Sequence, residues 1–424
     1  MHRILIGTVC AVALVAAACS SDTDTASVTT VESTTPVATT TPDTAPPTTT
    51  AVETTVPVVD GPADARGIVE VLASDELTGR DDDTPGSEAA QAFLYAQISA
   101  FTEPAFDGRD GIDGYLQELP RGHNLIGVIP GTDLADQYVV IGAHYDHIGS
   151  DCPTNVPGDS ICNGATDNAA GVAVAVSAAR ALAASGSNRR TVILALWDQE
   201  EDGLVGSAFY TANPVVPLAQ TVAYINFDIQ GSDFLPSLAD STIAVGAETG
   251  GVAFVDAVTA AASGSTLKTA QLSVIFGQGR SDHVNFVNGG VSSVFFTDAT
   301  NGCYHTSQDD VAGVNFDKLD QQVNTATALL ADIASTETIP VFDAAAPVAT
   351  YADAVALLDF AGPAQADFGL LSNQAEADAK KLLADLQAIV DAGPAAFNDA
   401  SIGTLLGGAA AFVEAVTQVA CLAS

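Results

Sequence analysis

Short and almost entirely apolar runs recur along the chain, with segments of helical character between them. Such runs occur at 138–143, 191–197 and 222–227. A strand with apolar side chains on both sides has no face for solvent, so it is expected inside a parallel sheet that helices cover on both faces. The sequence therefore predicts an α/β fold, with a mixed, largely parallel central sheet sandwiched by helices.

The composition of the chain changes three times and predicts four segments. Residues 1–19 start with a short positive region and continue as an apolar run too short to span a bilayer, which is typical of a lipoprotein-type signal peptide with Cys19 as the lipidated residue. Residues 20–60 are rich in Thr and Pro, lack aromatic residues and are expected to be a disordered linker. Residues 61–339 carry the alternating strand and helix pattern, whereas 340–424 are Ala-rich and are expected to form a small helical appendage.

Charge and the leader limit the partners and the location of the protein. The 52 Asp and Glu residues against 13 Lys and Arg residues give a formal net charge of −39, which repels the phosphates of nucleic acids. No segment after the leader is predicted to cross a bilayer. We therefore expect an exported protein held at the cell surface by a lipid on Cys19, or a secreted protein if Cys19 is not lipidated.

Four cysteines lie in the segments predicted to fold. In an oxidising compartment, pairing is the default, and Cys152 and Cys162 bracket one loop and are the expected disulfide. The pairing of Cys303 and Cys421 stays open. The sequence contains no Cys-x-x-Cys pair, so thiolate ligation of zinc is not expected.

Histidine and carboxylate side chains follow the buried strands. His144, the pair Glu200 and Glu201, and Asp228 come just after the ends of three runs. Asp167 is expected to open a helix, and His305 lies in a further loop. Carboxyl ends of parallel strands share one edge of a sheet, where α/β proteins bind ligands. Imidazole and carboxylate ligands suit Zn²⁺. One bridging carboxylate with two more ligands for each ion would hold a pair of metals.

Five strings in this order resemble the M28 family of di-zinc aminopeptidases. Two further strings, 72–80 and 279–283, also resemble the family, and the resemblance covers most of 61 to about 338. Small departures are Ala170, where the family often has Ser, and Ile229, where Met is common. The five strings are Ala143-His144-Tyr145-Asp146-His147, Asp167-Asn168-Ala169-Ala170-Gly171, Gln199-Glu200-Glu201-Asp202-Gly203, Asn226-Phe227-Asp228 and Tyr304-His305-Thr306.

The resemblance implies a role for each matching residue. It implies two zinc ions, with Co²⁺ or Mn²⁺ as possible substitutes, and Asp167 as the ligand that bridges them. Glu200 would be the general base for a metal-bridged water. The remaining implied roles are one zinc held by His144 and Asp228, the other by Glu201 and His305, an imidazole oriented by Asp146, and substrate contacts from Tyr304 and Arg280.

The resemblance implies the hydrolysis of N-terminal residues from peptides with a free N-terminus. Carboxypeptidases and glutaminyl cyclases share similar folds and ligand sets, so they remain alternatives. A binding protein that has kept the fold without catalysis is another alternative, because a fold alone does not define a function.

Overall fold

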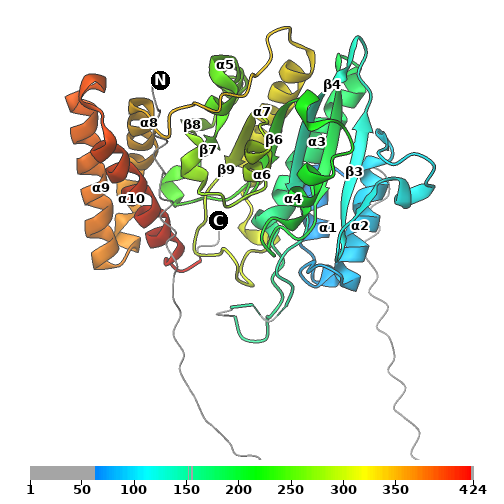
Figure 1. Ribbon diagram of the computed structural model, residues 1–424. Helices are drawn as coiled ribbons and strands as arrows, with labels where there is room; N and C mark the ends of the chain where they lie inside the picture. Colours follow the sequence, from blue (N-terminus) through cyan, green and yellow to red (C-terminus); the bar gives the residue numbers. More distant parts are fainter. Residues whose placement is uncertain (1–62, 151, 154–155, 422–424) are drawn as a thin grey trace, which may run out of the picture. The chain divides into compact units, whose positions relative to one another are not determined.

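The computed structural model describes residues 63–150, 152–153 and 156–421 (Figure 1). The signal peptide predicted at 1–19, including Cys19, and the linker predicted at 20–60 lie outside these residues. The predictions about them therefore stay predictions.

One sheet runs through the described part of the chain. Its strands follow the order β1-β3-β5-β4-β6-β9-β7-β8, with β2 paired to β3. The pairs β5–β4, β4–β6, β6–β9 and β7–β8 are parallel, and the pairs β1–β3, β2–β3, β3–β5 and β7–β9 are antiparallel. The strands are β1 (Glu103–Pro104), β2 (Leu116–Glu118), β3 (His123–Ile129), β4 (Leu134–His144), β5 (Arg190–Trp197), β6 (Thr221–Phe227), β7 (Ser241–Val245), β8 (Lys268–Leu272) and β9 (Ser293–Thr297).

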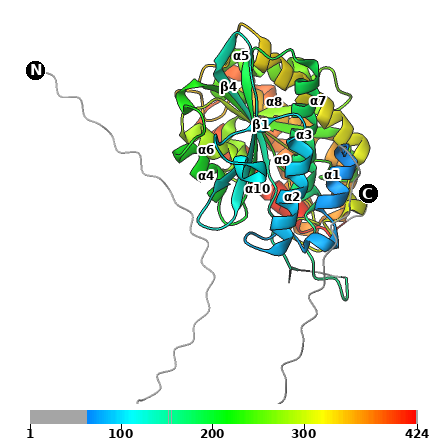
Figure 2. The ribbon, with the colours of Figure 1, turned by 90° about the vertical axis from the view of Figure 1, so that its right-hand side faces the viewer.

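Helices cover both faces of this sheet (Figures 1 and 2). One face packs on α1, α3, α5 and α7, and the other on α4 and α6. The helices are α1 (Ala65–Leu72), α2 (Pro85–Ile98), α3 (Ala170–Ser185), α4 (Val205–Ala212), α5 (Gly251–Ala262), α6 (His283–Asn288), α7 (Phe316–Ser335), α8 (Tyr351–Ala361), α9 (Asn373–Ala392) and α10 (Asp399–Thr417). The predicted fold class, a mixed and largely parallel sheet between helices, is confirmed.

Alternation of side chains along β4 explains why both faces need cover. Val139 and Ile141 point into the cluster with α1, α3 and α7, whereas Val140 points to the opposite cluster, which contains Trp197 and Phe286. All of these side chains are buried. Successive residues of a strand face opposite sides of the sheet, so a continuous apolar run is buried only if helices cover both faces.

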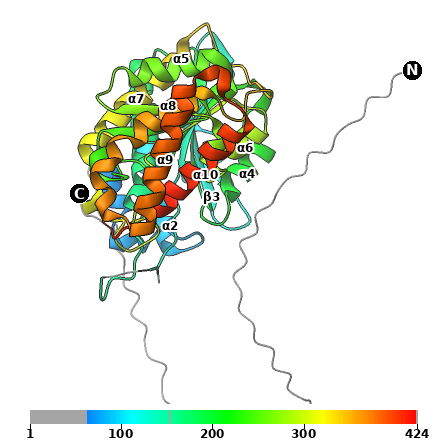
Figure 3. The ribbon, with the colours of Figure 1, turned by 90° about the vertical axis from the view of Figure 1, so that its left-hand side faces the viewer.

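A third apolar cluster joins the C-terminal helices to the β7–β8 edge of the sheet. Figure 3 shows helices α8, α9 and α10 on the side that faces the viewer. Asp353 connects helix α8 to the loop after β8. Its carboxylate accepts hydrogen bonds from the Ser273 backbone N–H at 2.6 Å and from the Ser273 hydroxyl at 2.8 Å. A disulfide between Cys303 and Cys421, 118 residues apart in the sequence, holds the segment after α10. The appendage expected from 340 onward is thus helical and is packed on the sheet.

The second disulfide joins Cys152 to Cys162, the pair expected from the sequence. It closes the loop between β4 and α3, and Cys162 is buried. The structure also supplies the pairing of Cys303 that the sequence left open.

Three sequence expectations differ from the structure. Strand β8 was not expected, because polar residues alternate along Lys268–Leu272 and the segment lacks the continuous apolar run of a buried strand. Asp167 does not open α3 but lies in the irregular turn Ala165–Ala169 before it. Two described helices, Ala165–Ser185 and Asp399–Thr417, are long and apolar enough to cross a membrane by length and composition, whereas the sequence predicts no such segment after the leader. The former is mostly buried in the protein, and core helices of soluble proteins pass the same test.

The ionisation of Glu248 makes the free energy of unfolding depend on pH. Its carboxyl accepts a hydrogen bond from the Val274 backbone N–H at 2.6 Å, and burial raises its pKa to about 7. The native state therefore binds a proton that the unfolded chain releases at lower pH, so this contribution to stability is lost as pH rises from about 4.5 through about 7.

Replacing Glu248 with Gln should remove this loss, because an amide oxygen can accept the same hydrogen bond without ionising. We expect the melting temperature of Glu248→Gln to exceed that of the wild type at pH 8, by on the order of 1–3 °C, and to match it at pH 5. Thermal unfolding at the two pH values measures this, with the exposed Glu103→Gln as the matched control. An equal gain at both pH values would contradict the assignment.

Candidate metal centre

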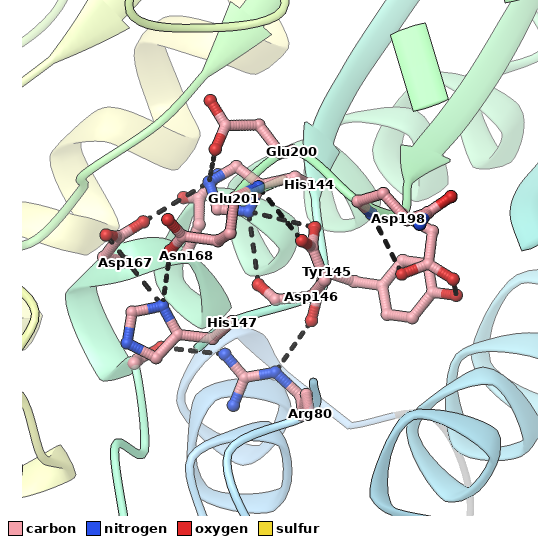
Figure 4. Close-up of polar contacts among 12 residues, drawn as sticks. Arg80, His144, Tyr145, Asp146, His147, Asp167, Asn168, Asp198, Glu200 and Glu201 are labelled. Carbon is pink, nitrogen blue, oxygen red and sulfur yellow. Dashed lines mark hydrogen bonds and ion pairs between the residues drawn. The ribbon is translucent and has the colours of Figure 1, made fainter. Parts of the chain in front are cut away.

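The ends of three adjacent parallel strands deliver the first site residues (Figure 4). His144 is the last residue of β4, Glu200 and Glu201 follow β5, and Asp228 follows β6 directly. Because β5, β4 and β6 are neighbours with parallel register, their carboxyl ends meet at one edge. The structure therefore brings together the side chains that the sequence placed at strand ends.

Asp167 lies between two imidazoles. Its Oδ1 is 3.3 Å from Nε2 of His144, and its Oδ2 is 3.1 Å from Nε2 of His305. The Asp167 side chain is almost fully buried, and the peptide bond that follows it is cis. One carboxylate thus faces two nitrogen donors through its two oxygens, which is the geometry of a bridge.

Two groups of potential ligands share Asp167. In each group the ligand atoms lie within 4.8 Å of one another. His144, Asp167 and Asp228 form the first group, and His147, Asp167, Glu201 and His305 form the second. All five residues predicted as metal ligands belong to these groups, divided between them as the sequence prediction has it.

The donor set fits zinc. It contains only imidazole nitrogens and carboxylate oxygens, which Zn²⁺ accepts. Nε2 of His305 is buried and has no hydrogen-bond partner, although it lies 3.0 Å from Oε2 of Glu201 and 3.1 Å from Oδ2 of Asp167. A cation between these three atoms would satisfy the imidazole lone pair and the two carboxylates together.

Glu200 lies beside both groups without belonging to either. Its Oε2 is 3.9 Å from Nε2 of His144, and its side chain is buried but lines the cavity next to Asp167 and Asp228. Burial raises the pKa of Glu200 well above the usual range of a glutamate, although nearby His144 opposes the shift. A carboxylate in this position is free to exchange a proton.

Asp146 and His147 each hold a neighbouring ligand in place. Oδ1 of Asp146 is 3.4 Å from Nδ1 of His144, and its Oδ2 accepts a hydrogen bond from the Glu201 backbone N–H at 3.2 Å. Nδ1 of His147 lies 2.7 Å from Oε1 of Glu201. The sequence reasoning gave Asp146 this orienting role but gave His147 none, although both residues stand in the same string.

Arg80 supports the loops of the site from the interior, and sequence reasoning missed this role (Figure 4). The fully buried guanidinium donates to the backbone oxygens of Tyr145 at 2.8 Å, Asn163 at 2.6 Å and Gly164 at 3.1 Å, and also to that of Leu72. Burial lowers the pKa of Arg80 to about 10, so the group stays charged at neutral pH. The sequence feature that could have indicated this role is the position of Arg80 at the end of the string 72–80, which resembles the family.

Two further residues fix the turn that carries Asp167. The carboxylate of Asp309 accepts hydrogen bonds from the backbone N–H groups of Thr166 at 2.9 Å and Asp167 at 3.0 Å. The side chain of Asn168 donates to the carbonyl of Phe227 at 2.9 Å and accepts from Gly171 N–H at 3.1 Å. A Cβ at Gly171 would lie 2.0 Å from the Asn168 side-chain oxygen, so the string needs glycine there.

Tyr304 and Arg280, the two predicted substrate contacts, line the same cavity as Asp167, Glu200 and Asp228. The Tyr304 ring stacks on the His305 ring with centroids 3.8 Å apart. Burial raises the pKa of Tyr304, so its hydroxyl keeps its proton. Arg280 is exposed at the cavity. Both residues can reach a bound molecule, and neither is among the candidate metal ligands.

The fold is that of zinc-exopeptidase-like domains, and its candidate metal-binding groups lie at the carboxyl ends of the parallel strands. A solved Zn-dependent exopeptidase from Parabacteroides distasonis has the same fold, with a TM-score of 0.51, 16% identity, and cover of 65% of this chain and 97% of its own. Residues 124–330 match Peptidase family M28, so this part of the chain is a domain of that family.

Curated relatives match over shorter stretches. The mouse Aminopeptidase NAALADL1 is 36% identical over 118 residues, which are 26% of this chain and 14% of the relative. The Probable glutamate carboxypeptidase AMP1 of Arabidopsis thaliana is 33% identical over 124 residues, which are 28% of this chain and 16% of the relative. The matched stretches thus span about a seventh of the length of these proteins.

Replacing Arg80 with Met should destabilise the loops that carry the candidate metal ligands. The apolar side chain fills a similar volume but leaves four carbonyl oxygens without their donor, so we expect a loss of stability of about 3–5 kcal/mol and weaker retention of zinc. Chemical unfolding and metal analysis after dialysis measure the two effects. Arg109→Met, at an exposed arginine, is the control. Unchanged stability and zinc content would contradict the role assigned to Arg80.

Proposed function

We propose that the protein is a zinc-dependent aminopeptidase that removes N-terminal residues from peptides. The observation that carries this proposal is the pair of ligand groups joined by Asp167, with Glu200 beside them and outside both. A hydrolase needs a group that is close to the metals but does not bind them, and Glu200 meets both conditions.

Two zinc ions would be held by the five predicted ligands, His144 and Asp228 on one side, Glu201 and His305 on the other, and Asp167 between them. When bound there, zinc lowers the pKa of a water and polarises a carbonyl. Glu200 accepts the proton of the attacking water and passes it to the leaving amine. Tyr304, which keeps its proton, can donate a hydrogen bond to the carbonyl oxygen of the substrate.

The charges around the cavity favour a substrate with a free amine. Glu200 and Glu414 line it outside both ligand groups, and a protonated amine is the part of a peptide N-terminus that carboxylates attract. Arg280 on the same cavity favours the alternative of a carboxypeptidase, because a guanidinium binds a terminal carboxylate well. Glutaminyl cyclase activity and a binding role without catalysis are the remaining alternatives.

We further propose that the protein is exported and is attached to the membrane by a lipid on Cys19. The support for this is the leader, whose short positive region, apolar run and small residues before Cys19 are followed at once by a polar stretch. The domain would then meet peptides outside the cell.

Substrates with free and blocked ends separate these functions. We expect leucyl-4-nitroanilide to be hydrolysed, N-acetyl-leucyl-4-nitroanilide not to be hydrolysed, and all activity to disappear with a chelator and return with added zinc. Cleavage of a C-terminal residue from an N-blocked peptide would favour the carboxypeptidase. Activity that is indifferent to chelation would contradict the metal site.

Replacing Glu200 with Gln should remove the proton shuttle and leave the metals in place. We expect kcat to fall by about 10²–10⁴-fold, with the zinc content of the purified protein unchanged. The matched control is Glu118→Gln, at an exposed carboxylate on β2. Full activity of Glu200→Gln would exclude the base assignment, and loss of zinc would make Glu200 a ligand.

A further inference from the structure

The cavity at the candidate metal centre extends well beyond the catalytic groups. It encloses about 670 Å³, and Asp167, Glu200 and Asp228 line one part of it. The volume is in the range of pockets that hold drug-sized ligands, roughly 300–1,000 Å³. Such a space is far larger than the carboxylates and one peptide bond need.

The part away from the carboxylates is apolar and has two different walls. One wall is the sheet edge, with Ile243, Leu272 and Phe295 from β7, β8 and β9. The other is formed by the C-terminal helices and includes Phe360 of α8, Leu382 of α9 and the α10 segment 409–414. The second wall lies outside the residues that match the peptidase family, 124–330.

Helix α10 presents a stripe of small side chains to this space. Ala410, Val413 and Thr417 line the cavity at spacings of three and four residues, so they lie on one face of the helix. All three are partly exposed, whereas Phe412 is buried in the cluster with α9. Small residues on this face leave the cavity open where larger ones would fill it.

We infer that α8, α9 and α10 form one wall of the substrate cavity, which we call the specificity wall. The cavity then takes a large apolar side chain of the substrate, of aromatic size or larger, next to the bond that is cut. This inference rests on the proposed function for the identity of the bond. The carboxylates and the apolar space line one cavity, so a peptide bound at the metals places a neighbouring side chain between the sheet edge and α10. Burying that side chain supplies affinity in proportion to its apolar area.

A bulky residue on α10 tests the wall. Ala410→Phe adds a ring to the lining face, and Val413→Thr replaces a methyl group with a hydroxyl at nearly constant volume. Ala400→Phe, at an exposed residue of the same helix, is the matched control. We expect wild type and control to hydrolyse phenylalanyl-4-nitroanilide at least about 10-fold better in kcat/KM than alanyl-4-nitroanilide. In Ala410→Phe this ratio should fall by at least about 10-fold, because kcat/KM for the phenylalanyl substrate falls more than kcat/KM for the alanyl substrate.

A binding measurement separates this inference from the proposed function. The neutral fluorophore N-phenyl-1-naphthylamine should bind the zinc-loaded full-length protein, and Ala410→Phe and Val413→Thr should both weaken its binding while Ala400→Phe does not. If Ala410→Phe matches Ala400→Phe in both the substrate ratio and the probe titration, the specificity wall is overturned. If no anilide is cut but the probe responds as expected, the aminopeptidase is overturned and the apolar binding cavity stands.

Discussion

Burial of many carboxylates in one place is the constraint on which the site depends. Asp146, Asp167, Asp228 and Asp309 are buried around the imidazoles of His144 and His147, with Glu200 and Glu201 beside them. Removing a charge from water costs several kcal/mol unless a partner offsets it. Arg80 is the interior cation that faces this group in the described part of the chain, and one guanidinium does not balance it. Divalent cations at the two ligand groups would supply the missing positive charge.

The candidate ligands come from both strand ends and loops, and their backbones are held in place in different ways. Parallel strands bring His144 and Asp228 to one edge, where neighbouring strands fix their backbones. Glu201 lies in the turn after β5, and its backbone N–H donates to the carboxylate of Asp146. Asp167 and His305 come from loops and need separate support, which Asp309 and the disulfide of Cys303 provide. Ligands on strands are thus positioned by hydrogen bonding in the sheet, and ligands on loops by side chains that bind the loop backbone.

Sequence reasoning predicted the parts of the structure that follow from local patterns. The apolar runs gave the central strands within about one residue, except that β4 begins earlier, and the strings around Asp167 and His305 placed their side chains with the strand-end residues. Strand β8 was missed because it lies toward an edge and alternates polar residues, so it lacks the buried-strand pattern. Arg80 and Asp309 were missed as supports because most of their partners are backbone groups 65 or more residues away, which no periodicity reveals.

The bond between Cys303 and Cys421 has a consequence for the order in which the protein is assembled. Cys303 lies two residues before His305, whereas its partner is 118 residues further along the chain. A chain made from its N-terminus exposes the strands and the first four ligands long before Cys421 emerges. The loop of the last ligand can be fixed covalently only after α8, α9 and α10 have been synthesised and the thiols have met an oxidant. Completion of the site is therefore a late event in biosynthesis, coupled to the chemistry of the compartment where folding ends.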